Sequence, residues 1–337
     1  QLMVLWSTKE TPAIRVSGHW WKPGSRFSID EDGGHVIPGM VCAWWYDGKR
    51  MYEPLVIKEC RMALVNDEHP LWPADGSGEG TGAIVPILDE DFSLGMRPGN
   101  KGLWLCLTSD AEARAEGAPT SFEAELTPWW GPPSTLTYRN NVYGFDMGYD
   151  ILRLQGTKLS LKVDGEEFEG TAYFQKVSVQ APSFPWYWGM LHFNDGSYID
   201  WFKPHATPGM TSMDDRPWRR RDFLRTPAIG TGIFHDANRG RTENFKRCEV
   251  EVSEPDGEEP LRDEQGNALP KFRIRIWNGR TQISIDVRAC SRARWTFDQP
   301  TRAGMVSHLT YNEYPLEVER IAILDEQGLR TIDDYEW

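Results

Sequence analysis

One stretch near the C-terminus restricts the fold more than any other: KFRIRIWNGRTQISIDVRA, residues 271–289, in which apolar and polar side chains alternate. Side chains of a β-strand point alternately to its two faces, so each half of this stretch is predicted to be a strand with one apolar face. Asn278-Gly279 separates the halves and is typical of the type I′ turn, because both residues accept positive φ. A two-residue turn pairs Trp277 with Arg280 and predicts an antiparallel hairpin. Its buried face would contain Phe272, Ile274, Ile276, Thr281, Ile283, Ile285 and Val287.

A second hairpin is predicted at residues 157–174, TKLSLKVDGEEFEGTAYF. Asp164-Gly165 occupies its turn and pairs Val163 with Glu166. The alternation then places five small or apolar residues on one face: Leu159, Leu161, Phe168, Gly170 and Ala172.

Short strand-like runs bounded by turn residues fill much of the remaining chain. Glycine and proline, with 31 and 23 residues, cluster between the runs, a spacing typical of β-sandwiches and β-barrels. A length of 337 residues suggests two domains, and the least interrupted division lies near Gln180. We therefore expect an all-β protein with domains at 1–180 and 181–337. The runs span residues 13–18, 40–65, 102–109, 121–126, 178–202, 247–254, 293–298, 316–324 and 329–337.

The charge balance argues against a nucleic-acid partner. The chain has 37 Lys and Arg residues against 50 Asp and Glu residues, a formal net charge of −13, whereas a nucleic-acid interface needs a basic surface. No stretch approaches the roughly 20 uninterrupted apolar residues of a membrane-spanning helix, and residues 1–9 are too short for a signal peptide. We expect neither an integral membrane segment nor a targeting segment, and the sequence leaves localisation and oligomeric state open.

The cysteines and histidines predict neither a disulfide framework nor a metal centre. The five cysteines are widely spaced and contain no C-x-x-C pair, and the seven histidines contain no H-x-H or H-E-x-x-H. Each cysteine lies in or beside an apolar run, so we expect buried, unreactive thiols. We expect no cofactor and no metal.

Three polar stretches carry weaker patterns. Residues 214–225, DDRPWRRRDFLR, contain five arginines in the manner of a phosphate site, but three aspartates lie among them and favour a self-paired surface. Residues 212–224 have helical character, whereas residues 109–118, the other helical candidate, are expected to form a loop. Residues 74–82, ADGSGEGTG, lack the strand-to-helix setting of a phosphate loop and are expected to be a hairpin tip.

Tryptophan is unusually frequent, with 16 residues. Adjacent residues of a strand point to opposite faces, so one ring of each doublet can face a cavity while the other packs outside. Two interpretations have equal weight: the rings fill two cores, or they line a cavity for an apolar or polyunsaturated ligand. The doublets and near-doublets are Trp20-Trp21, Trp44-Trp45, Trp129-Trp130 and Trp186-Tyr187-Trp188.

Residues 184–202, FPWYWGMLHFNDGSYIDWF, are the most informative segment for function. If residues 194–196 form a type I turn with Gly196 in the left-handed region, His192 pairs with Tyr198. If Asp195-Gly196 forms a two-residue turn instead, His192 moves to the face opposite Asp200. We prefer the first register, in which six side chains share a face: Trp186, Trp188, Met190, His192, Tyr198 and Asp200.

Asp200 is the candidate acid of this segment. Beside tryptophan and tyrosine rings its carboxyl would be poorly solvated, which favours the protonated form near neutrality and makes it a proton donor. The alternative is a structural role, in which Asp200 caps a strand end or forms a salt bridge. A structural role is likewise the alternative for His192.

Three motifs between Tyr149 and Phe202 carry a family resemblance: GTAYFQK at residues 170–176, WYW at residues 186–188 and HFNDGSYID at residues 192–200. They resemble the carotenoid 1,2-hydratase/AttH-like family of two-domain lipocalins. In that family a G-x-A-W run ends the first domain, and W-D-W followed by L-x-D-G and a hydrophobic strand opens the second. The resemblance covers about a sixth of the chain.

The resemblance implies two lipocalin-like (calycin) β-barrels with an aromatic cavity between them, an architecture similar to that of fungal lipocalin-like pericyclases. Carried over position by position, the tyrosine and aspartate of the family's Y-x-D strand fall on Tyr198 and Asp200, and the tryptophan of G-x-A-W falls on Tyr173. The sequence departs from the family at residues 174–176, where the family has Asp-His, and at Tyr187, the middle of W-D-W.

We therefore expect a cofactor-independent enzyme that acts on a lipophilic, unsaturated, terpenoid- or polyene-type molecule by acid-assisted hydration or by cyclisation or isomerisation. Asp200 is the expected proton donor, and Tyr198 or His192 would orient water or substrate. The alternatives are a non-catalytic carrier of a hydrophobic ligand and a structural module. Aromatic and thioether side chains would hold the substrate: Tyr173, Trp186, Trp188 and Met190.

Overall fold

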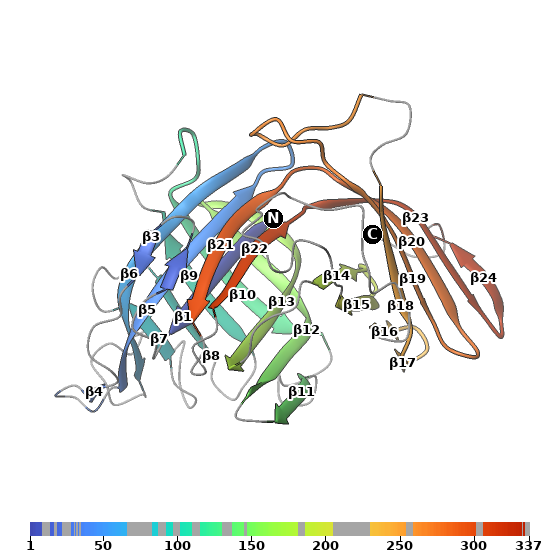
Figure 1. Ribbon diagram of the computed structural model, residues 1–337, viewed down its shortest axis with the longest axis horizontal. Helices are drawn as coiled ribbons and strands as arrows, with labels where there is room; N and C mark the ends of the chain where they lie inside the picture. The colour runs from blue at the N-terminus through green and yellow to red at the C-terminus, as the bar shows by residue number, and fades with distance from the viewer. Residues whose placement is uncertain are drawn as a thin grey trace. The chain divides into compact units, whose positions relative to one another are not determined.

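The computed structural model shows an all-β protein built of antiparallel sheets (Figure 1). It describes residues 1–8, 14–16, 19–21, 28–29, 31, 33, 35–65, 83–86, 92–96, 102–109, 115–129, 137–144, 147–180, 186–204, 230–253, 259–300, 306–331 and 333. Within these ranges no helix is long and apolar enough to cross a membrane. The all-β prediction is confirmed, and lipocalin-type barrels stay a prediction.

Most of the weaker polar patterns fall outside the described residues. These are the glycine-rich run at 74–82, the helical candidate at 212–224 and the arginine-rich stretch at 214–225. The described part of the other helical candidate, residues 115–118, lies in a turn rather than a helix, and Gly117 there has a φ of 79°.

The chain folds into two compact units that are interleaved in sequence. Unit 1 contains residues 1–45, 52–182 and 298–307, and unit 2 contains residues 46–51, 183–297 and 308–337. One change of unit falls between Pro182 and Ser183. The lipocalin-like domains expected at 1–180 and 181–337 stay a prediction.

Unit 1 is built on an eleven-stranded sheet with the order β1-β5-β6-β7-β8-β9-β10-β12-β11, in which β4 also pairs with β5 and β13 with β12. Its core includes the buried side chains of Val41, Leu55 and Phe122. The strands are β1 Leu2–Thr8, β4 Ser28–Ile29, β5 His35–Tyr46, β6 Met51–Val65, β7 Ala83–Pro86, β8 Phe92–Met96, β9 Leu103–Thr108, β10 Ser121–Pro128, β11 Thr137–Gly144, β12 Met147–Val163 and β13 Glu166–Gln180.

The long β12–β13 hairpin has the predicted turn. Asp164 and Gly165 have φ values of 50° and 86°, as a type I′ turn requires, and Val163 pairs with Glu166. The Asp164 carboxylate also accepts the N–H of Ser121 at 2.8 Å, which ties the turn to the start of β10. The predicted alignment of the small and apolar residues along this hairpin is confirmed.

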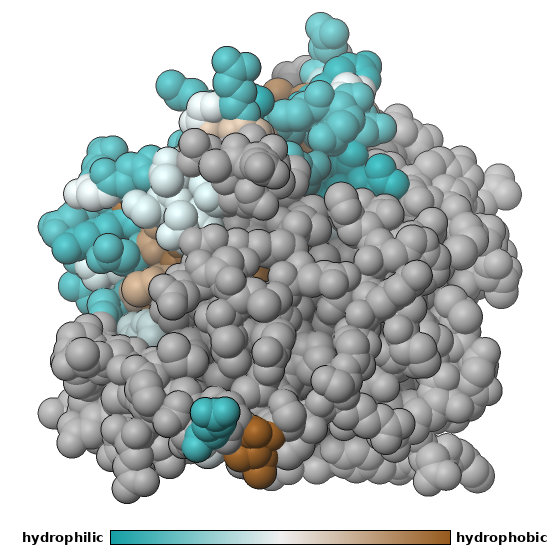
Figure 2. Space-filling view, turned by 90° about the vertical axis from the view of Figure 1, so that its left-hand side faces the viewer, coloured by the Kyte–Doolittle hydropathy of each residue, from teal (hydrophilic) through white to brown (hydrophobic). Residues whose placement is uncertain are grey.

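One face of the molecule carries no continuous apolar patch among the residues that the structure describes. Figure 2 shows that its coloured residues are mainly hydrophilic and that the hydrophobic ones form small separate spots. Single exposed apolar side chains are normal on a protein surface, so this face gives no argument for a docking site.

Unit 2 contains two antiparallel sheets that share one core. The four-stranded sheet β14-β15-β16-β17 contributes Ile199, Trp201 and Phe234, and the five-stranded sheet β18-β19-β20-β23-β24 contributes Ile276 and Ile285. Packing of two sheet faces in this way is typical of a β-sandwich. The strands are β14 Trp186–His192, β15 Tyr198–Pro204, β16 Thr231–Asp236, β17 Arg241–Phe245, β18 Cys248–Ser253, β19 Lys271–Trp277, β20 Gln282–Ala289, β23 Leu316–Asp325 and β24 Gly328–Thr331.

A further four-stranded sheet has the order β22-β21-β2-β3. Strand β21 begins in unit 2 and ends in unit 1, and β22 returns from unit 1 to unit 2. This double crossing, together with the assignment of residues 46–51 to unit 2, accounts for the interleaved sequence of the units. The strands are β2 Ile14–Val16, β3 His19–Trp21, β21 Ala293–Pro300 and β22 Val306–Glu313.

The alternating stretch at 271–289 forms the predicted hairpin with a different turn. Trp277 pairs with Gln282 and not with Arg280, so the predicted register is wrong, although an even shift keeps every side chain on its predicted face. Neither residue of the Asn-Gly pair has positive φ. Instead, the Asn278 side-chain oxygen accepts the backbone N–H groups of Arg280 and Thr281 at 2.8 Å each. This side-chain bonding stabilises a wider turn than the dipeptide predicts.

The described cysteines differ in accessibility. Burial raises the pKa of the thiols of Cys42 and Cys248 to about 12, so the expectation of unreactive thiols is confirmed there. Cys106 is exposed, and the expectation is wrong for it. Its position explains the difference, because Cys106 falls on the outward side of the alternating strand β9 while Leu105 and Leu107 point into the core.

Candidate functional site

The β14–β15 hairpin adopts the register that the sequence analysis prefers. Gly196 has a φ of 86°, and the Phe193 N–H donates to the Ser197 carbonyl at 3.0 Å. His192 therefore pairs with Tyr198, and the alternative two-residue turn is wrong. The type I turn is favoured over the two-residue turn because glycine at its last position adopts the left-handed conformation without a Cβ clash.

The four-stranded sheet of unit 2 has one core face and one face that carries the predicted site. Ile199 and Trp201 point into the core, so the alternation directs Tyr198 and Asp200 to the opposite side. Met190 lies directly across from Asp200 on β14. The structure thus brings six of the seven predicted site residues together. We call their shared side the aromatic face; it consists of Trp186, Trp188, Met190, His192, Tyr198 and Asp200.

Asp200 is buried on the aromatic face, with 3% of its surface exposed. The indole N–H of Trp188 donates to Asp200 Oδ1 at 3.1 Å. The two residues lie diagonally across the β14–β15 pair, a position from which a long side chain reaches its neighbour. The carboxyl therefore contacts an aromatic partner in a place that is poorly hydrated, as its position in the sequence predicts.

Tyr198 stacks on a second aromatic residue and remains protonated. Its ring lies parallel to the imidazole of His235 on β16, with the centroids 5.5 Å apart and the planes at 16°. Burial, and secondarily the charge of Asp200, raises the pKa of the Tyr198 phenol, which keeps its hydroxyl available as a donor. Burial also lowers the pKa of His235 despite two nearby carboxylates, and its Nδ1 lies 2.8 Å from Thr242 Oγ1. Both rings are therefore neutral at pH 7.

His192 contacts a thioether within its own strand. Its Nε2 lies 2.9 Å from Met190 Sδ, and both side chains are half-buried on the aromatic face. When Nε2 carries the hydrogen, the imidazole donates to a weak acceptor. The role of His192 in orienting water or substrate stays a prediction.

Tyr311 extends the row of aromatic rings beyond Trp186. The two rings meet edge to face with centroids 5.3 Å apart, and Trp295 of β21 stacks on Tyr311 at 5.0 Å with an angle of 4°. Edge-to-face and stacked arrangements are the favoured geometries of aromatic pairs. We call these three residues, together with Glu313, the Tyr311 cluster. The predicted site residues do not include its members on β21 and β22, which are Trp295, Tyr311 and Glu313.

Glu313 is the carboxylic acid of the Tyr311 cluster. Two residues beyond Tyr311 on β22, it falls on the same side of the strand. The side chain is half-buried, and desolvation raises the pKa of its carboxyl to about 7. Among the described residues, the carboxyl has no hydrogen-bond or ion-pair partner. The alternation in TYNEY, residues 310–314, was the available signal, but it does not indicate which strand Glu313 faces.

Tyr173 is the predicted site residue that belongs to the other unit. It lies on β13 of unit 1, and 40% of its surface is exposed. Alternation along β13 is compatible with an exposed aromatic side chain at this position. Its role as a substrate contact stays a prediction.

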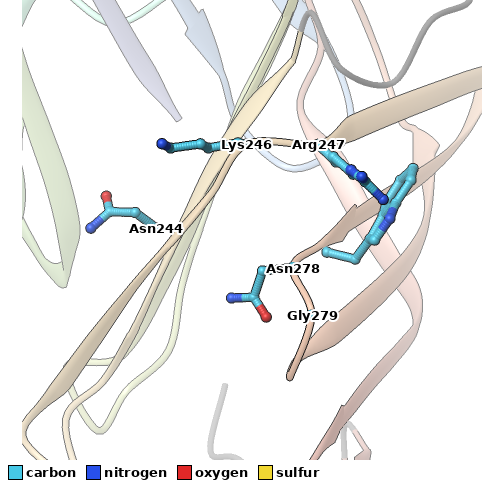
Figure 3. A pocket seen from close by; sticks show the side chains of 6 residues that line it. Asn244, Lys246, Arg247, Asn278 and Gly279 are labelled. Carbon is cyan, nitrogen blue, oxygen red and sulfur yellow. The ribbon is translucent and has the colours of Figure 1, made fainter.

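A pocket of about 320 Å³ lies at one end of unit 2 (Figure 3). In Figure 3 the side chains of Lys246 and Arg247 point away from each other. The Asn278 amide donates to Glu243 Oε2 at 3.2 Å. None of the predicted site residues lines this pocket, and most of its lining residues are exposed, unlike the buried Asp200 of the aromatic face. The lining residues are Asn244, Lys246, Arg247, Trp277, Asn278 and Gly279.

No group of three or more histidine, cysteine or carboxylate side chains that could hold a metal ion occurs in the described part of the chain. Comparisons of the chain with protein-family models, with curated proteins and with solved structures find no match. The function is therefore argued from the geometry of the aromatic face and from the chemistry of its residues.

Proposed function

We propose that the chain is a cofactor-independent enzyme that acts on a lipophilic, unsaturated small molecule of terpenoid or polyene type, by acid-assisted hydration or by cyclisation or isomerisation. The observation that carries the proposal is the position of Asp200, whose buried carboxyl lies among aromatic rings and accepts the Trp188 N–H. A carboxyl in this setting is poorly hydrated, which favours its protonated form.

Asp200 acts as the proton donor in this proposal. Burial favours the neutral form of an acid, because a buried charge loses its hydration. The Trp188 N–H donates to Oδ1 of this carboxyl, and the neutral form of the acid supplies the proton that is transferred. In hydration, this proton moves to one carbon of a C=C bond and water adds to the other carbon. The proton that the added water releases returns to Asp200, whereas in isomerisation the returning proton leaves a neighbouring carbon.

The rings of the aromatic face stabilise the cation that protonation creates. A cation over the face of a desolvated aromatic ring gains about 2 kcal/mol, and tryptophan gives the strongest interaction. Trp186 and Trp188 supply two such rings, two residues apart on the same side of β14. The neutral phenol of Tyr198 lies beside Asp200 and provides a hydroxyl that orients water or a substrate oxygen.

The resemblance described from the sequence motifs is a further argument for this function. The Y-x-D strand of the carotenoid 1,2-hydratase/AttH-like family aligns with Tyr198 and Asp200, and the proposal includes the two-domain lipocalin architecture of that family. The departures at residues 174–176 and at Tyr187 alter positions next to the expected substrate contacts. They argue for a substrate different from those of the family's hydratases.

The test uses the full chain and separates binding from turnover. Binding is followed with cis-parinaric acid, a fluorescent polyene, and turnover with farnesol and all-trans-retinol in H₂¹⁸O. Hydration adds one labelled water to the product mass, whereas cyclisation or isomerisation changes retention time at constant mass. Asp200→Asn preserves the shape and removes the transferable proton, so we expect turnover to fall by about 10²- to 10⁴-fold while parinaric acid binding stays unchanged.

The exposed Asp333 provides the matched control, and Asp333→Asn should behave as the wild type. Turnover that survives in Asp200→Asn would refute the acid role. Binding of the probes without any product from the wild type would assign the chain to the carriers. A wild-type chain that binds none of the probes would refute both the enzyme and the carrier.

A further inference from the structure

The Tyr311 cluster combines aromatic rings with an acid, Glu313, for which the described part of the chain supplies no hydrogen-bond or ion-pair partner. Tyr311 stacks on the ring of Trp295 and meets the ring of Trp186 edge to face, at centroid distances of 5.0 and 5.3 Å. Glu313 follows on the same side of β22 and keeps part of its surface accessible. The accessible part of the Glu313 residue lets a ligand approach this side of the strand.

The groups around Glu313 do not neutralise it. The titratable side chains in electrostatic contact with it are the phenols of Tyr311 and Tyr314. Burial raises the pKa of both phenols, so both are uncharged at neutral pH. Arg292 approaches Tyr314, but its guanidinium is bonded to the buried Asp263. Desolvation is the one effect on the Glu313 carboxyl, with no contribution from a cation among the described residues.

We propose that the Tyr311 cluster binds an organic cation, a protonated amine or a quaternary ammonium group, with Glu313 as its counter-ion. The inference rests on the proposed function in one respect, namely that the aromatic face is a ligand site, and it adds a positively charged group to the substrate class. Aromatic faces attract cations through their quadrupoles, and tryptophan and tyrosine are the rings that recognise quaternary ammonium ligands. At the Tyr311 cluster itself, an anionic group would be repelled by the carboxylate, and a neutral group would leave the carboxylate unpaired.

Binding of such a cation is coupled to the protonation of Glu313. The cation favours the ionised carboxyl, so the protonated form competes with binding. With the pKa of Glu313 at about 7, the carboxyl is half-ionised at neutrality. Linkage then gives an affinity that is about tenfold higher at pH 8 than at pH 6.

The experiment compares choline with 3,3-dimethyl-1-butanol, a neutral molecule of nearly the same shape. Both carry three equivalent methyl groups, and binding to the full chain is followed by the broadening of their methyl proton signals at pH 6, 7 and 8. We expect choline to bind more tightly than the alcohol at pH 8, and its affinity to fall about tenfold by pH 6, while the alcohol shows no pH dependence.

Glu313→Gln keeps the shape of the side chain and removes its charge. We expect this variant to lose at least about tenfold in choline affinity at pH 8 and to lose the pH dependence. The exposed Glu259 is the matched control, and Glu259→Gln should bind choline as the wild type does. Equal binding of choline and the alcohol, or unchanged choline binding by Glu313→Gln, would overturn the inference.

Parinaric acid separates the two proposals. If the wild type binds parinaric acid and converts farnesol or retinol but shows no preference for choline over the alcohol, the cation site is refuted and the proposed function stands. If it binds choline through Glu313 but produces no hydrated or rearranged product, the cation site stands and the enzyme is refuted. Near-ultraviolet circular dichroism of each variant tests whether the aromatic packing is retained.

Discussion

Glu313→Gln should stabilise the protein at neutral and alkaline pH and leave its stability unchanged in acid. The carboxyl has a pKa of 4.5 in its ordinary state and about 7 in the folded protein, because burial disfavours its charge. The folded state thus binds this proton more tightly than the unfolded state. The stability that the proton supplies is complete below pH 4.5 and is lost as the pH rises through 7. Glutamine resembles the neutral form and loses nothing over this range.

The shift of the Glu313 pKa sets the expected magnitude. Each unit of pKa shift corresponds to about 1.4 kcal/mol, so the wild type should lose about 3 kcal/mol relative to the variant between pH 4.5 and 7.5. Most of the change falls between about pH 5 and pH 7, and the difference is nearly constant above. A desolvated carboxyl with a compensating partner would show a much smaller change.

Urea unfolding of both proteins at several pH values measures this difference. Tryptophan fluorescence and far-ultraviolet circular dichroism should give coincident transitions where a single unfolding free energy is fitted. Glu259→Gln, at an exposed position, should differ from the wild type by a small amount that does not depend on pH. If Glu313→Gln also shows a pH-independent difference, the Glu313 carboxyl is not desolvated in the folded state and the reasoning fails.

Two further predictions concern packing and thiol chemistry. A Cβ at Gly189 would lie 2.2 Å from the Trp201 ring, so Gly189→Ala should lower the free energy of unfolding by about 1–3 kcal/mol. A Cβ at Gly170 would meet open space, so Gly170→Ala should be neutral or slightly stabilising in the same urea assay. Iodoacetamide at pH 8 should modify the exposed Cys106 at least about a hundredfold faster than the buried Cys42, whose thiol has a pKa of about 12. Peptide mass spectrometry measures both rates, and equal rates would contradict the burial of Cys42.

Local sequence patterns predict the parts of the fold that are determined within a few residues. The turns at Asp164-Gly165 and at residues 194–196 are correct, because in each the left-handed residue is fixed by the turn itself. The turn at Asn278 is not correct, since its side chain bonds the next backbone N–H groups and offers a competing conformation. Nine of the described strands lie outside the predicted runs and hairpins, namely β1, β3, β4, β7, β8, β11, β16, β17 and β22. Strands β11 and β17 show one reason. They have little apolar alternation, and their neighbours in the sheet supply the pairing.

The candidate site divides in the same way between local and distant residues. Trp188 and Asp200 belong to one hairpin, so a correct turn is sufficient to place them on one face. Tyr311 contacts Trp186, and Trp295 contacts Tyr311, from strands far along the chain. The sequence pattern of a single strand does not indicate which other strand that strand packs against. Contacts of this kind are determined by the packing of whole sheets, which the sequence alone does not reveal.

The carboxylates of unit 2 show why Glu313 is better explained by a ligand than by the fold. Desolvation acts to raise the pKa of Asp286, but hydrogen bonds from two arginines outweigh it and lower that pKa, so the charge contributes to stability. Asp325 behaves similarly, and the buried Asp263 is bonded to Arg292. Glu313 has only the desolvation effect, so its ionised form destabilises the folded unit. A glutamine would pack equally well and avoid this cost, and therefore an acid at this position is useful only if something outside the described residues meets its charge or takes its proton.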